Sequence, residues 1–264
     1  MNRLHVETTG SGPDLVLLHG WAMHGGVFGP LVDALASRFR LHLVDLPGHG
    51  HSRDSALPLQ LAPVVDELTQ HLPRALWAGW SLGGLFALQA AVTQPTQVRG
   101  LVMLCASPKF VRNDDWPQGM SQDVFRGFAR GLREDYRKTI DGFIALEAMG
   151  SDDARGDMRM LREEVFARGE PAPQTLGEGL MLLEQSDFRP ALPTLRMPTL
   201  WLAGRRDRLV DPRAMQAAAE VVPDARVVVE NAGHAPFLTH ADAVAAELDA
   251  FDAHVAAREA EQAR

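Results

Sequence analysis

The sequence has a single cysteine, Cys105, among its 264 residues. One cysteine cannot form an internal disulfide or a cysteine-rich zinc site. Residues 1–7 contain no apolar stretch of the length found in signal peptides. We therefore expect a cytoplasmic protein that uses no metal and no other cofactor.

Long hydrophobic runs and excess positive charge are also missing. The longest apolar runs, 15–18 and 101–106, are far shorter than the ~20 residues of a membrane-spanning helix, so no membrane span is expected. The chain carries 26 Lys+Arg against 34 Asp+Glu, a net charge of −8, which disfavours a nucleic acid partner. A hydrophobic fraction of 46% indicates one sizeable core, and we expect a monomer.

Short apolar runs recur along the chain, and each ends in polar or small residues. Such continuous runs are typical of buried parallel strands. They lie at 14–18, 41–44, 76–78, 101–105, 199–202 and 226–229, and helical patterns separate them at 31–37, 61–72, 83–93, 212–222 and 241–256. This alternation predicts an α/β fold with a mostly parallel sheet and helices on both faces.

The alternation stops between about residues 110 and 190, where helical patterns occur without a strand-like run. Phe125, Phe128, Leu132 and Tyr136 share one helical spacing there, and Arg126, Arg130, Arg133 and Arg137 share another. We expect 110–190 to be a helical cap inserted into one core that is formed by 1–109 and 191–264.

The sequence Gly79-Trp80-Ser81-Leu82-Gly83-Gly84 stands between a predicted strand and a predicted helix. A serine in such a turn takes strained backbone angles, and glycines are needed where a side chain would collide with the neighbouring elements. Its hydroxyl is then exposed at a helix N-terminus, which favours developing negative charge. Ser81 is therefore a candidate nucleophile, and the alternative is an ordinary glycine-rich turn.

A serine nucleophile needs a base and an acid that orients the base. His234 follows the predicted strand 226–229, and Asp207 follows the strand 199–202, so both lie at the same edge of a parallel sheet. Asp211 competes with Asp207, but it more simply caps the helix beginning at Pro212. The chain order Ser81, Asp207, His234 is the order expected for this type of sheet.

The tetrahedral oxyanion that forms when a serine attacks a carbonyl group needs two amide donors. The amide of Leu82 follows the nucleophile, and that of Trp21 follows another predicted strand through His19 and Gly20. We expect these two amides to form the oxyanion hole. His19 is interpreted as a structural residue, and Asp45 as part of a turn.

Together these features resemble the α/β-hydrolase superfamily. The segments LVLLHGW, LHLVDLPGHGHS, GWSLGGL, DDWP, FIALEAMG and AGHAPF further resemble the pimeloyl-acyl-carrier-protein methyl ester esterases of biotin synthesis. This resemblance implies a serine carboxylesterase that releases methanol from a dicarboxylate monomethyl ester on acyl carrier protein. It implies that the substrate site is formed by Trp21, Ser81, Leu82, Phe143, Ile144, Ala145, Leu146, Glu147 and His234.

An acidic carrier protein needs a locally basic docking surface on an enzyme of net charge −8. The candidates are Lys138 and, at helical spacing, Arg155, Arg159 and Arg162. Gly142 departs from the family, which tends to carry a basic residue there, and the arginines at 126–137 are a second candidate. A solvated helix face explains any of these charge stripes equally well.

Other functions remain open at this point. A broad-specificity short-chain carboxylesterase would use the same triad. A non-catalytic ligand receptor on the same scaffold is disfavoured by the intact triad. Ser81 excludes a haloalkane dehalogenase, which needs a carboxylate nucleophile, and the cap resemblance argues against a carbon–carbon bond hydrolase.

Overall fold

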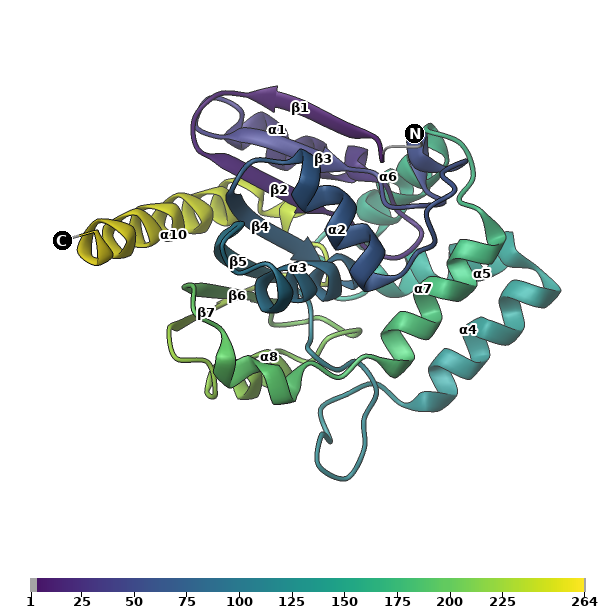
Figure 1. The fold of residues 1–264 in the computed structure, drawn as a ribbon. Helices are drawn as coiled ribbons and strands as arrows, with labels where there is room; N and C mark the ends of the chain where they lie inside the picture. The colour runs from purple at the N-terminus through teal and green to yellow at the C-terminus, as the bar shows by residue number, and fades with distance from the viewer. Residues whose placement is uncertain (1–3, 264) are drawn as a thin grey trace.

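The computed structural model describes residues 4–263, which form an α/β structure around one sheet (Figure 1). Within these residues the sheet has seven strands in the order β1-β3-β2-β4-β5-β6-β7. The strands are β1 Val6–Gly10, β2 Asp14–Leu18, β3 Arg40–Val44, β4 Ala75–Trp80, β5 Val98–Leu104, β6 Thr199–Gly204 and β7 Ala225–Glu230. Only β1 runs antiparallel to its neighbour. The predicted α/β fold with a mostly parallel sheet is confirmed.

The six predicted apolar runs overlap β2 to β7, but β1 was not predicted. Its sequence, Val-Glu-Thr-Thr-Gly, has one apolar residue and exposes Glu7 and Thr8 to solvent. An antiparallel strand at the edge of a sheet does not have to be buried on both faces. It therefore lacks the continuous apolar run that marks the parallel strands.

Helices cover both faces of the sheet. A Cβ at Gly100 of β5 would contact Phe251 and Val255 of α10, whereas Met103 on the same strand lies against α3 at Gly84. Because residues an odd number of positions apart on a strand point to opposite faces, α3 and α10 lie on opposite sides. The helices of this part are α1 Gly29–Leu35, α2 Leu61–His71, α3 Leu82–Thr93, α8 Pro212–Ala219, α9 Pro236–Thr239 and α10 Ala241–Gln262.

The chain between β5 and β6 contains four α-helices among its described residues. They are α4 Gln122–Glu134, α5 Tyr136–Glu147, α6 Ala154–Ala167 and α7 Pro173–Gln185. They gather at one side of the sheet, and α10 projects from the other side of the molecule (Figure 1). We call residues 110–190 the helical segment.

The helical spacing that runs from Phe125 to Tyr136 in the sequence spans two helices in the structure, α4 and α5. Asp135 has an extended backbone, and its carboxylate accepts a hydrogen bond from the Lys138 amide at 3.1 Å. This side-chain cap starts a new helix, because it satisfies an amide that has no partner within the helix. Arg137 therefore lies on α5, and Arg126, Arg130 and Arg133 lie on α4.

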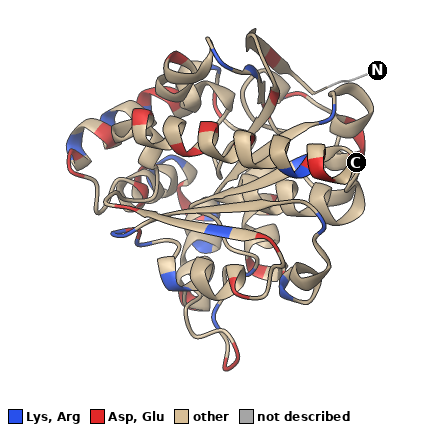
Figure 2. Cartoon of the chain, turned by 90° about the vertical axis from the view of Figure 1, so that its left-hand side faces the viewer, with Lys and Arg blue, Asp and Glu red and all other residues tan. Residues whose placement is uncertain are grey.

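On the side of the molecule that Figure 2 shows, acidic and basic residues are interspersed along the helices. No helix among residues 4–263 combines the length and the apolar character needed to cross a membrane.

Candidate active site

Ser81 lies in the tight turn that joins β4 to α3. Its φ of 53° and ψ of −117° are strained for a residue with a side chain. Its amide donates to the Leu104 carbonyl at 3.1 Å, which ties the turn to β5. A Cβ at Gly79 would collide with the backbone of Gly83, and one at Gly83 would collide with the Leu18 carbonyl. The turn therefore requires both glycines, as the sequence predicted.

His234 and Asp207 are joined at the carboxyl ends of β7 and β6. Nδ1 of His234 donates to Oδ2 of Asp207 at 2.8 Å, and both side chains are fully buried. Nε2 of His234 is also buried and has no hydrogen-bond partner among the described residues. With Nδ1 donating, Nε2 carries the free lone pair of a neutral imidazole. It is therefore the ring atom that can accept a proton.

The His234 loop is held against the serine turn by Trp80, which precedes Ser81. Nε1 of Trp80 donates to the His234 carbonyl at 2.9 Å, and the two rings lie 5.7 Å apart. The structure thus brings the three predicted triad residues to one edge of the sheet.

Asp207 and Asp211 have different surroundings. Oδ1 of Asp207 accepts from the amides of Leu209 and Val210 at 2.8 and 2.9 Å, which leaves Oδ2 directed at His234. Asp211 instead caps α8 by accepting from the Arg213 amide at 2.9 Å. The capping role predicted for Asp211 is confirmed.

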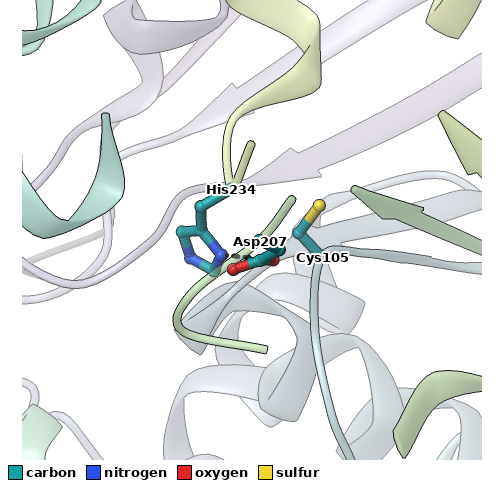
Figure 3. Close-up of side chains that lie close together, drawn as sticks. All are labelled: Cys105, Asp207 and His234. Atoms are coloured by element: carbon teal, nitrogen blue, oxygen red, sulfur yellow. Dashed lines mark hydrogen bonds and ion pairs between the residues drawn. The ribbon is translucent and has the colours of Figure 1, made fainter. Parts of the chain in front are cut away.

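Cys105 lies beside this pair, as Figure 3 shows. Its sulfur, a carboxylate oxygen of Asp207 and a ring nitrogen of His234 all lie within 4.8 Å of one another. Burial, and then the charge of Asp207, raise the pKa of the Cys105 thiol well above its ordinary value. The Cys105 thiol is therefore held in its protonated form, which is the less nucleophilic one.

The two predicted oxyanion donors lie beside the serine. Leu82 is the first residue of α3, where a helix amide has no partner within its own helix. A Cβ at Gly20 would lie 3.3 Å from that of Ser81, so the chain passes directly over the turn before Trp21. The indole of Trp21 is buried and donates to the Leu176 carbonyl of α7 at 2.8 Å. That bond fixes the loop that carries the Trp21 amide.

Ser81 faces a small apolar cavity, and its exposed fraction is only 3%. The free space is about 20 Å³, which is room for about one water molecule. All the other lining residues are apolar: Phe110, Met120, Phe125, Phe128, Phe143, Leu180, Leu183 and Leu209. The cavity can therefore contact an aliphatic chain but holds none in its present shape.

Within the stretch 143–147, only Phe143 lines this cavity. Its ring packs edge-on against those of Trp21 and Phe128, at 4.7 and 5.6 Å. Ile144 is buried without lining the cavity, Leu146 is half-buried, and Ala145 is exposed because it points away from the core on α5.

Glu147 is buried, and neither of its carboxyl oxygens has a hydrogen-bond partner among the described residues. Burial, and then the charge of Asp207, raise the pKa of Glu147 well above its ordinary value. The neutral, protonated form of this carboxyl is therefore favoured relative to an ordinary glutamate.

The sequence interpretation did not identify most of the cavity wall. Phe125 and Phe128 had a signal, since they share a helical spacing. Phe110, Met120 and Leu209 had none, because they follow strands or lie in turns and reach Ser81 only through the tertiary fold.

Asp45 does more than the turn role predicted for it. It is fully buried at the end of β3, where it accepts from the amides of Gly25 and His51 at 2.7 and 2.8 Å. Arg168, just after α6, reaches both of its oxygens at 3.3 Å. Burial alone would raise the pKa of Asp45, but these amides and Arg168 together hold it below its ordinary value. The pair anchors the helical segment to the sheet.

His19 is buried beneath the Trp21 loop, and its Nε2 accepts from the Leu46 amide at 3.0 Å. Burial lowers its pKa to about 3, so the ring is neutral. These contacts match the structural role predicted for it.

The basic residues predicted to dock a carrier are all exposed on the helical segment. Lys138 lies on α5, and Arg155, Arg159 and Arg162 lie on α6. Arg162 is paired with Asp141 of α5 at 3.1 Å. Within residues 4–263, the side chains of Lys138, Arg155 and Arg159 have no ion-pair partner.

Known proteins share both the fold and most of the sequence. The family model described as the alpha/beta hydrolase fold matches residues 13–241. The pimeloyl-[acyl-carrier protein] methyl ester esterase of Stenotrophomonas maltophilia is 56% identical over 249 residues, 94% of this chain and 96% of that protein. The protein of the same name from Xanthomonas oryzae pv. oryzae is 55% identical over 253 residues, 96% of this chain and 100% of that protein.

Solved structures agree at the level of the fold. An esterase from Exiguobacterium antarcticum superposes with a TM-score of 0.84 at 22% identity, covering 94% of each chain. A bromoperoxidase from Bacillus anthracis gives a TM-score of 0.85 at 22% identity, again covering 94% of each. The chain therefore belongs to the α/β-hydrolase family, and within it to the group of its relatives named pimeloyl-[acyl-carrier protein] methyl ester esterase.

Proposed function

We propose that this protein is a serine carboxylesterase that hydrolyses the methyl ester of a pimeloyl group carried by acyl carrier protein, a step in biotin precursor synthesis. Identity of 55–56% to esterases of that name, over nearly the full length of both chains, carries the proposal. The arrangement of Ser81, Asp207 and His234 supports it chemically.

In this mechanism, Ser81 is the nucleophile and His234 is the base. The Ser81 hydroxyl gives its proton to Nε2 of His234 as its oxygen attacks the ester carbonyl. Asp207 holds the ring in the required tautomer and stabilises the imidazolium. The His234 imidazolium then gives that proton to the methoxide oxygen as its bond to the carbonyl carbon breaks, so that methanol leaves. A water molecule hydrolyses the acyl-enzyme by the same route.

The amides of Trp21 and Leu82 would stabilise the oxyanion of each tetrahedral intermediate. A donor of this kind typically lowers the barrier by ~2.7–4 kcal/mol. Two such donors together would lower the barrier by about 5–8 kcal/mol if their effects add.

The substrate class is supported by the lining of the cavity. A seven-carbon dicarboxylate monomethyl ester presents methylene groups, which suit the eight apolar side chains around Ser81. We propose that the helical segment, 110–190, acts as a cap over the core 1–109 and 191–264. Lys138, Arg155 and Arg159 would then meet the acidic carrier. The cytoplasmic location and the monomeric state stay predictions.

The test is methanol release by the purified protein from pimeloyl-acyl-carrier-protein methyl ester, compared with a free short-chain methyl ester. We expect a much higher kcat/KM for the carrier-linked ester, and no methanol release by the folded Ser81→Ala variant. Equal kcat/KM for the two esters would favour a broad-specificity carboxylesterase. Near-parental activity of Ser81→Ala would contradict the triad.

A further inference from the structure

The cavity around Ser81 is too small for the ester that it would have to admit. Its free space is about 20 Å³, and the serine is 3% exposed. An acyl chain of several methylene groups needs many times that volume. Some part of the cavity wall must therefore move before an ester can reach the hydroxyl.

A much larger groove lies on the outer surface between α4 and α5. Its volume is about 500 Å³, and glycines of both helices line it, at Gly127 and Gly131 of α4 and Gly142 of α5. A Cβ at Gly127 or Gly142 would have no atom within 4 Å, so these two positions leave open space. The exposed Lys138 lies at the groove together with the carboxylates of Glu134 and Asp135.

Phe128 belongs to both spaces. It lines the outer groove and also the cavity around Ser81. Its ring is half-buried and packs edge-on against Phe143 at 5.6 Å between centroids. A single aromatic side chain thus forms both the floor of the groove and part of the cavity wall.

The other shared wall is less suitable for entry. Phe110 and Leu209 separate the cavity from a second surface pocket, which has no free space for a water molecule. Entry of a substrate from that pocket would require Phe110 and Leu209 to move and the pocket itself to open.

We propose that the ester's acyl chain, with the linker to its carrier, enters between α4 and α5, and that Phe128 is the gate between the groove and Ser81. Rotation of the Phe128 ring joins the two spaces into one channel. Gly127 and Gly142 keep the outer part of that channel open, and Lys138 lies at its mouth. The inference rests on the proposed esterase function and adds the route that the substrate takes.

The experiment follows entry by covalent labelling of Ser81, because labelling does not depend on which ester is the natural substrate. One fluorophosphonate carries a long alkyl tail, and a second has only small alkyl groups. The double variant Gly127→Leu/Gly142→Leu adds side chains to the groove at two helical positions where a Cβ has no atom within 4 Å. Gly177→Leu on α7 is the matched control, because a Cβ there also has no atom within 4 Å.

We expect the double variant to slow labelling by the long-tailed reagent by about tenfold, equivalent to about 1.4 kcal/mol of activation free energy. Labelling by the small reagent should change much less, and Gly177→Leu should label like the parent. Phe128→Ala should accelerate labelling by the long-tailed reagent. Circular dichroism checks that each variant is folded.

Equal labelling rates in the double variant and Gly177→Leu would overturn the route, whatever Phe128→Ala does. Slower labelling of folded Phe128→Ala by the long-tailed reagent would overturn the gate. Failure of the parent protein to label at Ser81 would instead contradict the nucleophile, and hence the proposed function.

Discussion

At the scale of single residues, the two neighbouring carboxylates Asp207 and Asp211 show how position decides the role. They are four residues apart, yet one accepts from the His234 imidazole and the other from the Arg213 amide at the start of α8. The backbone amides of Leu209 and Val210 donate to Oδ1 of Asp207, which leaves Oδ2 to accept from His234.

We predict that Asp207→Asn lowers kcat by about 10⁴-fold, because an amide no longer selects the imidazole tautomer with a free Nε2. Asp211→Asn should leave kcat within about twofold, since asparagine also caps helices well. Steady-state kinetics on a chromogenic ester measure both. Similar losses in the two variants would contradict the assignment of Asp207 as the triad acid.

Glu147 leads to a prediction about stability. Its pKa is raised in the folded protein, so the native state keeps a proton that the unfolded chain releases above about pH 4.3. From there up to the raised pKa, the free energy of unfolding falls as the pH rises, by at most about 1.4 kcal/mol per pH unit. Glu147→Gln removes this titration.

The difference in Tm between Glu147→Gln and the parent should therefore shift in favour of the variant between pH 5 and pH 8. Thermal unfolding followed by circular dichroism measures it. Glu163→Gln, at an exposed position of α6, is the control and should show a constant difference. A constant difference for Glu147→Gln as well would mean that this carboxyl is ionised in the folded protein.

The grouping of Ser81, Asp207 and His234 could be predicted from the sequence because each follows a strand of the parallel sheet, directly or within four residues. The apolar run marks the strand, and the strand fixes the edge at which the side chain lies. Most of the cavity wall could not be predicted from the sequence. Leu180 comes from a helix and Leu209 from a turn, and their approach to Ser81 depends on tertiary packing. Nothing in the sequence indicated that Glu147 is buried without a hydrogen-bond partner among the described residues.

At the scale of elements, the same distinction separates the sheet from the helical segment. Parallel strands carry a strong hydrophobic signal, whereas β1 at the edge carries almost none. The helices of the segment were recognised as a region, but the boundary between α4 and α5 depends on one capping side chain, Asp135. Hydrophobic and arginine spacing continues across that boundary and conceals it.

The ion pair between Arg168 and Asp45 joins the end of α6 to the sheet, and this contact leads to a prediction about stability. Arg168→Met leaves the buried Asp45 carboxylate without its cation, and should reduce the free energy of unfolding by about 1.5–3 kcal/mol. Arg159→Met, at an exposed and unpaired position on α6, should change it by less than about 0.5 kcal/mol. Urea unfolding measures both values, and equal stabilities would show that the amides of Gly25 and His51 suffice for Asp45.

At the scale of the whole molecule, charge is the main obstacle to a carrier partner. A protein of net charge −8 repels an acidic partner at long range, so productive encounter depends on a local basic surface. Lys138, Arg155 and Arg159 are exposed and unpaired within the described chain, and are therefore free to attract an anion.

We predict that the triple variant Lys138→Glu/Arg155→Glu/Arg159→Glu raises the KM for the carrier-linked ester by about tenfold at low salt, since rim charges act mainly on encounter. Hydrolysis of a small free ester should hardly change. Arg196→Glu is the control: Arg196 is exposed and precedes β6, at the opposite end of the strand from Asp207. It reverses one charge away from the proposed docking surface, a change of −2 in net charge against −6 in the triple variant.

The salt dependence of KM separates this steering from damage to the site. The Debye length falls from ~10 Å at 0.1 M salt to ~3 Å at 1 M, so the difference between parent and triple variant should shrink as the salt concentration rises to ~0.5 M. A difference that persisted at high salt would indicate a distorted helical segment. If charge reversal left the KM for the carrier-linked ester unchanged at low salt, these three residues would form only a solvated surface, and a carboxylesterase indifferent to the carrier would describe the protein better.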